Sequence, residues 1–156
     1  RWSDFMEEKP EEKQLLSIDE IKELWSKTYS DEGKPDWSHI FPLYHDNIIF
    51  QDSIQRIEGK KEFKAMCNRL TKRCESLNMD IKNISKNDNI VMMEWKMTMS
   101  FRIFPPKPLY GTTRLTFDSK GLIIKQRDYY DLWGDIFDEI PLIKPIYRWF
   151  MKVIFG

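Results

Sequence analysis

Cysteine is scarce in this chain, which has only Cys67 and Cys74 among its 156 residues. Both fall on the apolar stripe of the segment 60–76, whose apolar residues recur at helical spacing. On one continuous helix seven residues span about 10.5 Å, which is too far for a disulfide bond. We therefore expect two buried free thiols, a reducing compartment and a cytoplasmic location.

Net charge and long apolar runs are missing as well. Lysine and arginine together number 25, and so do aspartate and glutamate, which leaves a formal net charge of zero. A nucleic-acid-binding protein typically shows a basic excess, so we expect no nucleic-acid partner. No apolar run has the length of a transmembrane helix. The histidine, cysteine and carboxylate spacings match no metal site, and no glycine-rich phosphate loop occurs, so we expect no metal or cofactor.

What the chain does have is apolar and aromatic content, at 41% and 14% of its residues, which indicates a globular protein. Its length suits one domain with a real core. Residues 1–14 are charged and interrupted by proline, and we expect a flexible arm there. Residues 15–156 show no linker and no repeat, which predicts a single domain.

The periodicity along the domain changes from helical to alternating. Ser17-Ile-Asp-Glu20 has capping-box spacing and predicts a helix start, and Asp36 could cap a second, short helix. A strand at 48–52 precedes a helix at 60–76. Strands then follow at 77–81, 90–103, 110–117 and 122–131, with a hairpin tip at Pro105-Pro-Lys-Pro108 and a helix at the C-terminal end. This order predicts an α+β fold, in which a curved, mostly antiparallel sheet has helices on one face.

The last strand carries an acid among aromatic residues. Alternate strand residues share a face, so Asp128 should point the same way as Gln126 and Tyr130. A buried acid is costly unless it is paired or used in chemistry. Asp128 could instead pair with Arg114 or Arg127, or accept a backbone N–H group.

Several segments in this order resemble the nuclear transport factor 2-like superfamily, and within it the SnoaL-like proteins. They are Leu43–Ser53, Glu58–Phe63, Phe117–Gly121 and Arg127–Asp131. The resemblance implies a cone-shaped, strongly curved sheet wrapped around the N-terminal helices, with an apolar pocket inside and a closing C-terminal helix. The superfamily contains isomerases, cyclases, hydrolases, dehydratases and non-catalytic binding modules, so the fold does not settle the function.

Ketosteroid isomerases of this superfamily use an aspartate base, and the resemblance puts Asp52 at that position, followed by Ser53 in place of proline. The two groups of their oxyanion hole fall near Trp25 and at Thr113, which are weaker donors. The resemblance therefore implies that the base is kept and the oxyanion hole is not.

Limonene-epoxide hydrolases of this superfamily use an aspartate that matches Asp128. Their catalytic arginine and second aspartate correspond to Trp95 and Met97 here, and the residues that hold the attacking water correspond to Phe50 and Asp52. An intact epoxide hydrolase site is therefore not expected.

Alternation and the resemblance together predict an apolar pocket with acids inside. The predicted catalytic residues are Asp52 as the base, with Tyr130 or Asp128 as the proton donor. The predicted ligand-binding residues are Trp25, Phe50, Met93, Trp95, Met97, Thr113, Leu115 and Phe117. This lining suits a small hydrophobic, steroid- or polyketide-like ligand and acid–base isomerisation, cyclisation or dehydration. The alternative is a non-catalytic, dimerising interaction module with a filled cavity.

The tail at 140–155 has Lys144, Arg148 and Lys152 four residues apart, with apolar residues between them. Such a basic amphipathic helix can lie on a membrane surface. It can equally cap the pocket mouth or pack in a homodimer, and we expect packing because the sheet would otherwise stay open.

Overall fold

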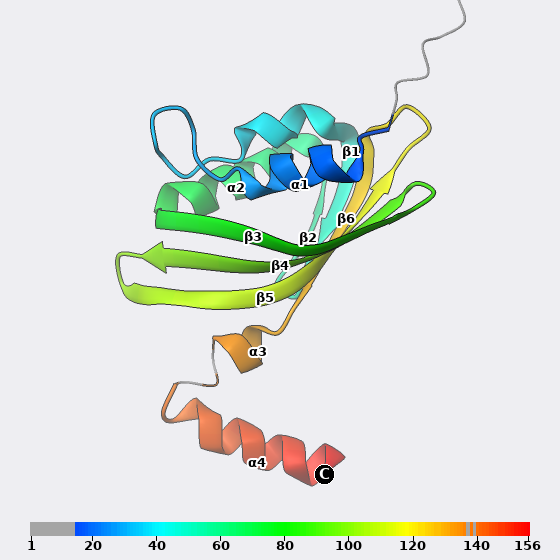
Figure 1. The fold of residues 1–156 in the computed structure, drawn as a ribbon. Coiled ribbons are helices and arrows are strands. Elements are labelled where there is room, and N and C mark those ends of the chain that lie inside the picture. Colours follow the sequence, from blue (N-terminus) through cyan, green and yellow to red (C-terminus); the bar gives the residue numbers. More distant parts are fainter. Residues whose placement is uncertain (1–14, 137, 139) are drawn as a thin grey trace, which may run out of the picture.

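The computed structural model describes residues 15–136, 138 and 140–156, so the arm expected at 1–14 lies outside the described residues. Figure 1 shows a strongly curved sheet with α1 and α2 on one side of it. The elements in chain order are α1 Ile18–Ser26, the 3₁₀ helix η1 Ser38–Leu43, β1 Tyr44–Gln51, β2 Arg56–Glu58, α2 Lys60–Arg73, β3 Cys74–Asn87, β4 Ile90–Phe101, β5 Phe104–Phe117, β6 Ile123–Tyr130, α3 Leu132–Asp135 and α4 Ile143–Phe155.

The six strands form one mixed, unclosed sheet in the order β2-β1-β6-β5-β4-β3. Four of its pairings are antiparallel, and β1 pairs with β6 in parallel, with Phe50 opposite Gln126. The register shifts in four of the five pairings, and such bulges bend and twist strands. The predicted α+β fold with a curved, mostly antiparallel sheet is confirmed.

Local signals explain where the helices begin. The Ser17 hydroxyl accepts the backbone N–H of Glu20, and the Glu20 carboxylate accepts that of Ser17, which completes the predicted capping box of α1. The second helix is the 3₁₀ turn η1, which begins at Ser38. Gly59, at a φ of 93°, precedes α2 in a conformation that favours glycine.

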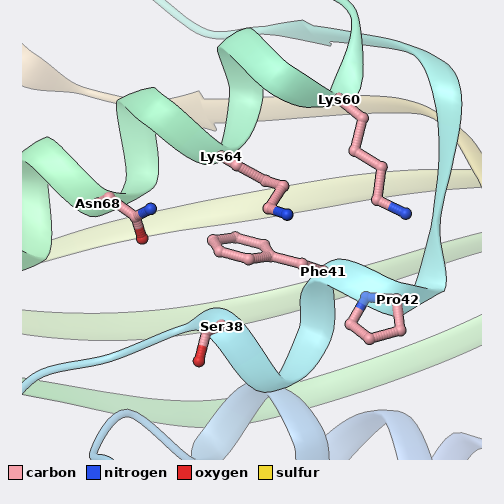
Figure 2. A pocket seen from close by; sticks show the side chains of 6 residues that line it. All are labelled: Ser38, Phe41, Pro42, Lys60, Lys64 and Asn68. Carbon is pink, nitrogen blue, oxygen red and sulfur yellow. The ribbon is translucent and has the colours of Figure 1, made fainter.

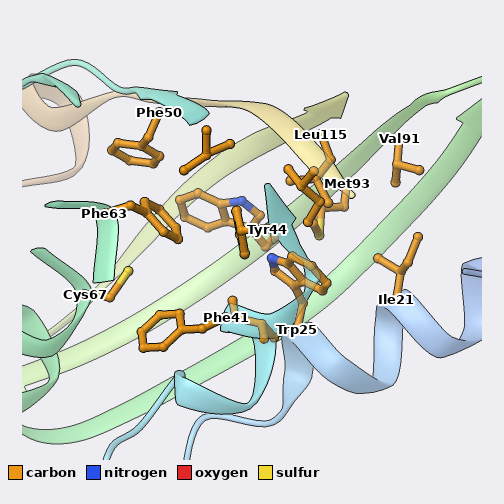
Figure 3. Packing of buried hydrophobic residues seen from close by; sticks show 14 of the residues in the cluster. Ile21, Trp25, Phe41, Tyr44, Phe50, Phe63, Cys67, Val91, Met93 and Leu115 are labelled. Carbon is orange, nitrogen blue, oxygen red and sulfur yellow. The ribbon is translucent and has the colours of Figure 1, made fainter. Parts of the chain in front are cut away.

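Apolar side chains from α1, η1 and α2 meet those of the sheet in one core (Figure 3). Ile21 of α1, Phe63 of α2 and Leu115 of β5 are all buried within it. The Phe63 ring lies against both Tyr44 and Phe50 of β1, with ring centres 4.5 and 5.5 Å apart. The burial of apolar surface in such a core is the main stabilising contribution to a fold.

The helix expected at 60–76 ends earlier, at Arg73. Cys74 is the first residue of β3 rather than part of the helix, and both cysteines are buried and free. The thiols are thus as expected, although the assumption of one continuous helix was wrong.

The tip of the β4–β5 hairpin, expected at Pro105–Pro108, lies earlier in the chain. The chain turns at Arg102 and Ile103, and the prolines belong to β5. This end of β5 pairs with β4 alone, because β6 pairs with β5 only from Gly111 to Phe117. Proline has no N–H to donate, so it is tolerated where one edge of a strand is free.

The C-terminal helix is present as α4, but it does not cover the sheet. It stands apart from the sheet beyond α3 (Figure 1), and none of its residues is buried. The expected packing of this helix against the sheet is therefore not seen. No helix in the described part of the chain is long and apolar enough to cross a membrane.

Candidate functional site

The eight side chains predicted to contact a ligand are all buried, seven of them on strands of the sheet and Trp25 on α1. They are Trp25, Phe50, Met93, Trp95, Met97, Thr113, Leu115 and Phe117. Strand register explains the arrangement, because Met93, Thr113 and Asp128 are direct partners across β4, β5 and β6. Their role in ligand binding stays a prediction, since Thr113 is hydrogen-bonded to Trp95 and Asp128 and the other seven pack in the core.

Asp128 is held on one of its two carboxylate oxygens. The Thr113 hydroxyl donates to Oδ1 over 2.7 Å, and the Gln126 side-chain amide donates to the same oxygen over 3.1 Å. No described residue donates to Oδ2. No ion pair joins Asp128 to a described lysine or arginine, so the suggested pairing with Arg114 or Arg127 is not seen. One oxygen is therefore fixed and the other is available.

Each donor to Asp128 is itself fixed by a second buried group. The Trp95 indole N–H donates to the Thr113 hydroxyl over 2.8 Å, and the Tyr44 hydroxyl donates to the Gln126 side-chain carbonyl. Indole nitrogen can only donate, so the Thr113 hydroxyl proton must point to Asp128. The Tyr44 bond likewise turns the Gln126 amide nitrogen toward the acid. These two relays orient Asp128 without adding a charge.

The pKa of Asp128 is raised toward neutral pH. Burial raises the pKa of Asp128 from 3.8 to about 6, while the hydrogen bonds from Thr113 and Gln126 oppose the rise and the charge of Asp52 adds to it. A carboxyl group with a pKa of about 6 is half-ionised at that pH and can both accept and give a proton within about one pH unit of it. Such a shift at an inward-facing acid is typical of functional sites, though structural networks also produce it.

Asp52 and Tyr130, the other two predicted catalytic residues, are brought together. The Tyr130 hydroxyl donates to Asp52 Oδ2 over 3.0 Å. Burial is the main reason that the pKa of Tyr130 rises to about 12, so the phenol keeps its proton at neutral pH. Oδ1 of Asp52 accepts the backbone N–H groups of Ile54 and Gln55, each over 2.8 Å, and thereby shapes the turn between β1 and β2.

The sequence prediction missed three residues of this arrangement as site residues. Gln126 shares a face with Asp128, which was the available signal, but it was not assigned to the site. Tyr44 had no signal, because its partner lies 82 residues away. Gly111 leaves space for the Trp95 indole: a Cβ there would come within 2.5 Å of that ring and 2.8 Å of the Tyr129 carbonyl oxygen.

Two hollows lie at the surface beside α2 rather than inside the sheet. One, of about 480 Å³, is bordered by Ser38, Phe41, Pro42, Lys60, Lys64 and Asn68 (Figure 2). The other, of about 400 Å³, is bordered by Asp46, Lys60, Lys61 and Lys64. Their lysines give them a cationic character, unlike the apolar pocket predicted from the sequence. The internal pocket is therefore still a prediction.

Comparison with protein families gives a match over most of the domain. A family described as an uncharacterised conserved protein, DUF2358, matches residues 27–126. No curated protein matches the chain.

Solved structures with the same fold are numerous and distant in sequence. An epoxide hydrolase from M. tuberculosis, described as similar to limonene-epoxide hydrolase, has a TM-score of 0.61 at 18% identity, covering 81% of this chain and 92% of its own. A nuclear transport factor 2-like protein of unknown function from Exiguobacterium has a TM-score of 0.61 at 15% identity, covering 74% and 98%.

A third structure is a hypothetical protein from Catenulispora acidiphila with a ketosteroid isomerase-like fold, in complex with trimethylamine. Its TM-score is 0.59 at 16% identity, covering 74% of this chain and 85% of its own. The chain therefore belongs to the DUF2358 family and has the fold of the nuclear transport factor 2-like superfamily.

Proposed function

We propose that this chain binds a small hydrophobic, steroid- or polyketide-like molecule inside its curved sheet and transfers a proton at an acidic carbon of that molecule. The observation that carries the proposal is Asp128, with one oxygen fixed by Thr113 and Gln126 and the other without a described donor. Its pKa of about 6 suits proton transfer near neutral pH. The apolar residues around it suit a hydrophobic ligand.

The geometry favours Asp128 over Asp52 as the acid–base group. Asp52 accepts three hydrogen bonds, two on Oδ1 and one on Oδ2, whereas Asp128 accepts two, both on Oδ1, and has no described donor to Oδ2. A base needs a free lone pair within reach of the proton it takes. In this proposal Asp128 removes and returns the proton. Tyr130 stabilises developing negative charge on the ligand by turning its single hydroxyl proton from Asp52 Oδ2 to the ligand.

Deuterium exchange tests this proposal without knowledge of the natural ligand. Ketosteroids and aromatic polyketides would be incubated with the protein in heavy water, and deuterium entering beside their carbonyl groups would be followed by NMR. We expect exchange with the wild-type protein and its loss in Asp128→Asn. Glu75→Gln, an exposed strand carboxylate, is the matched control and should exchange as the wild type does.

The pH dependence of this exchange follows from the same group. Asp128 acts as a base only when ionised, so the exchange rate should rise through a pH of about 6 and level off above it. A rate that is independent of pH across this range, or equal in Asp128→Asn, would contradict the proposed role.

A second function is favoured by the packing of the interior. Trp25, Trp95 and Met97 are buried in the core, and the Trp95 indole is hydrogen-bonded within it. These contacts suit a non-catalytic interaction module with a filled cavity, in which a homodimer would form through the outer face of the sheet. Melting temperatures measured with the same compounds separate the two functions: a rise with some compound supports binding, and no rise with any supports the module.

A further inference from the structure

Among the described residues, exposed large apolar side chains gather on α4. The side chains of Ile146, Trp149, Phe150 and Val153 are between 52% and 69% exposed. A patch of exposed apolar side chains of this kind marks a contact with a protein or a membrane. In the described part of the chain nothing covers it.

Contacts with the rest of the chain fix which face of α4 points outward. The Tyr147 ring stacks on Trp133 with ring centres 4.9 Å apart and planes at 12°. Arg148 donates from Nε and one Nη nitrogen to the two oxygens of Asp138, over 2.8 and 2.7 Å. Tyr147 and Met151, four residues apart, are the only half-buried residues of the helix. At 3.6 residues per turn, Ile146, Trp149 and Val153 lie about 100° or more from Tyr147 around the helix and therefore point away from its contact with Trp133.

The outward face is broader than the stripe that a protein groove usually holds. A groove typically contacts positions i, i+3, i+4 and i+7 of a helix, which here are Ile146, Trp149, Phe150 and Val153. Ile143 and Ile154 are also exposed and, at 3.6 residues per turn, widen the face to about 140°. A lipid surface accommodates such a width because the helix sinks into it along its whole length.

The charges on α4 all have the sign that a phospholipid surface attracts. Lys144, Arg148 and Lys152 are its only charged residues. Lys152 has no ion pair among the described residues, and Lys144 lies 3.7 Å from Asp138, which it shares with Arg148. Anionic lipid headgroups attract such cations. An acidic partner protein would attract them too and is the alternative that the test below distinguishes.

The length of α4 decides how it would meet a bilayer. Its 13 residues give a helix of about 20 Å, and a hydrocarbon core of about 30 Å needs roughly 20 residues to be spanned. Trp149, with an apolar ring and an N–H donor, suits the boundary between lipid and water. We propose that α4 is an interfacial helix that binds the surface of an anionic membrane, with its apolar face in the lipid and its cations among the headgroups.

Co-sedimentation of the full chain with lipid vesicles tests this. We expect binding to vesicles of phosphatidylcholine mixed with phosphatidylserine, weaker binding to phosphatidylcholine alone, and loss of the difference at high ionic strength. Lys144→Gln with Lys152→Gln should weaken binding by about fivefold per cation, or about thirtyfold together. The matched control, Lys120→Gln with Lys125→Gln, makes the same charge change on exposed residues outside α4 and should bind as the wild type does.

The apolar face is tested separately by Trp149→Ser with Val153→Ser, which should abolish binding to both kinds of vesicle. Ile54→Ser with Ile103→Ser is the matched control, because those side chains are 66% and 85% exposed elsewhere. Wild-type protein that stays in the supernatant with both vesicle compositions overturns the proposal. In that case sedimentation velocity tests whether the apolar face of α4 joins two copies of the chain. A wild-type dimer that Trp149→Ser with Val153→Ser dissociates would make this face a protein interface.

Discussion

Asp128 couples the stability of the fold to pH. Its pKa is about 6 in the folded chain and about 3.9 in an unfolded one. The folded state therefore holds the proton more tightly, so the free energy of unfolding should fall as the pH rises from about 4 to about 6. The shift of roughly two pKa units corresponds to about 3 kcal/mol.

Urea unfolding of wild type and Asp128→Asn between pH 4 and 8 measures this effect. Asparagine keeps an oxygen for Thr113 and Gln126 but cannot ionise, so its stability should lack the fall seen in the wild type. Parallel pH profiles for the two proteins would show that Asp128 is not the group responsible.

Gly111 is required by the residues around it rather than by its own backbone. A Cβ there would meet the Trp95 ring and the Tyr129 carbonyl oxygen. Such overpacking typically costs 1–3 kcal/mol, and we expect about that loss in the free energy of unfolding of Gly111→Ala. The loss should be smaller when Trp95→Phe is also present, since the clash with the backbone oxygen alone remains. Equal losses in the two backgrounds would rule out the indole as the cause.

Individual partners in the site were predictable only where they are close in sequence. The shared face of Gln126, Asp128 and Tyr130 follows from strand alternation, and the structure confirms it through the bond between Gln126 and Asp128. Tyr44 reaches this group through the pairing of β1 with β6, which lie far apart in the sequence. A sequence gives that pairing only after the register is known.

At the scale of elements, the turn after β1 depends on the side chain of Asp52. Its Oδ1 replaces a backbone acceptor for Ile54 and Gln55. Asp52→Ala should lower the free energy of unfolding by about 1–3 kcal/mol, because the donors lose their acceptor. Asp52→Asn retains that oxygen and should lose much less. If both variants are equally destabilised in urea, the charge matters more than the turn.

Element boundaries were predictable where one residue decides them locally. The capping box of α1, predicted from the spacing of Ser17 and Glu20, needed no tertiary information. The β4–β5 hairpin was misplaced because prolines usually mark turns, whereas here a free strand edge accepts them. Whether α4 covers the sheet was equally beyond local signals, since an amphipathic pattern indicates an apolar partner but not which one.

At the scale of the whole molecule, α4 adds little to the stability of the domain. Its contacts are with α3 and Asp138, and its own residues are not buried. A chain ending at Ile136, which packs against the core, should therefore keep the unfolding midpoint of the full chain within a few degrees. Thermal unfolding followed by circular dichroism measures this. A large drop in the midpoint would mean that α4 packs on the domain in solution.

The parallel pairing of β1 with β6 governs when the fold can be completed during synthesis. On the ribosome, β1 and β2 emerge early, while β3, β4 and β5 can form a meander of their own. The two parts of the sheet become one only when β6 emerges and inserts between them, and such non-local pairings form slowly. Until then Ile48 and Phe50 of the nascent chain lack their final neighbours, which makes the interval before β6 the period of greatest risk of aggregation.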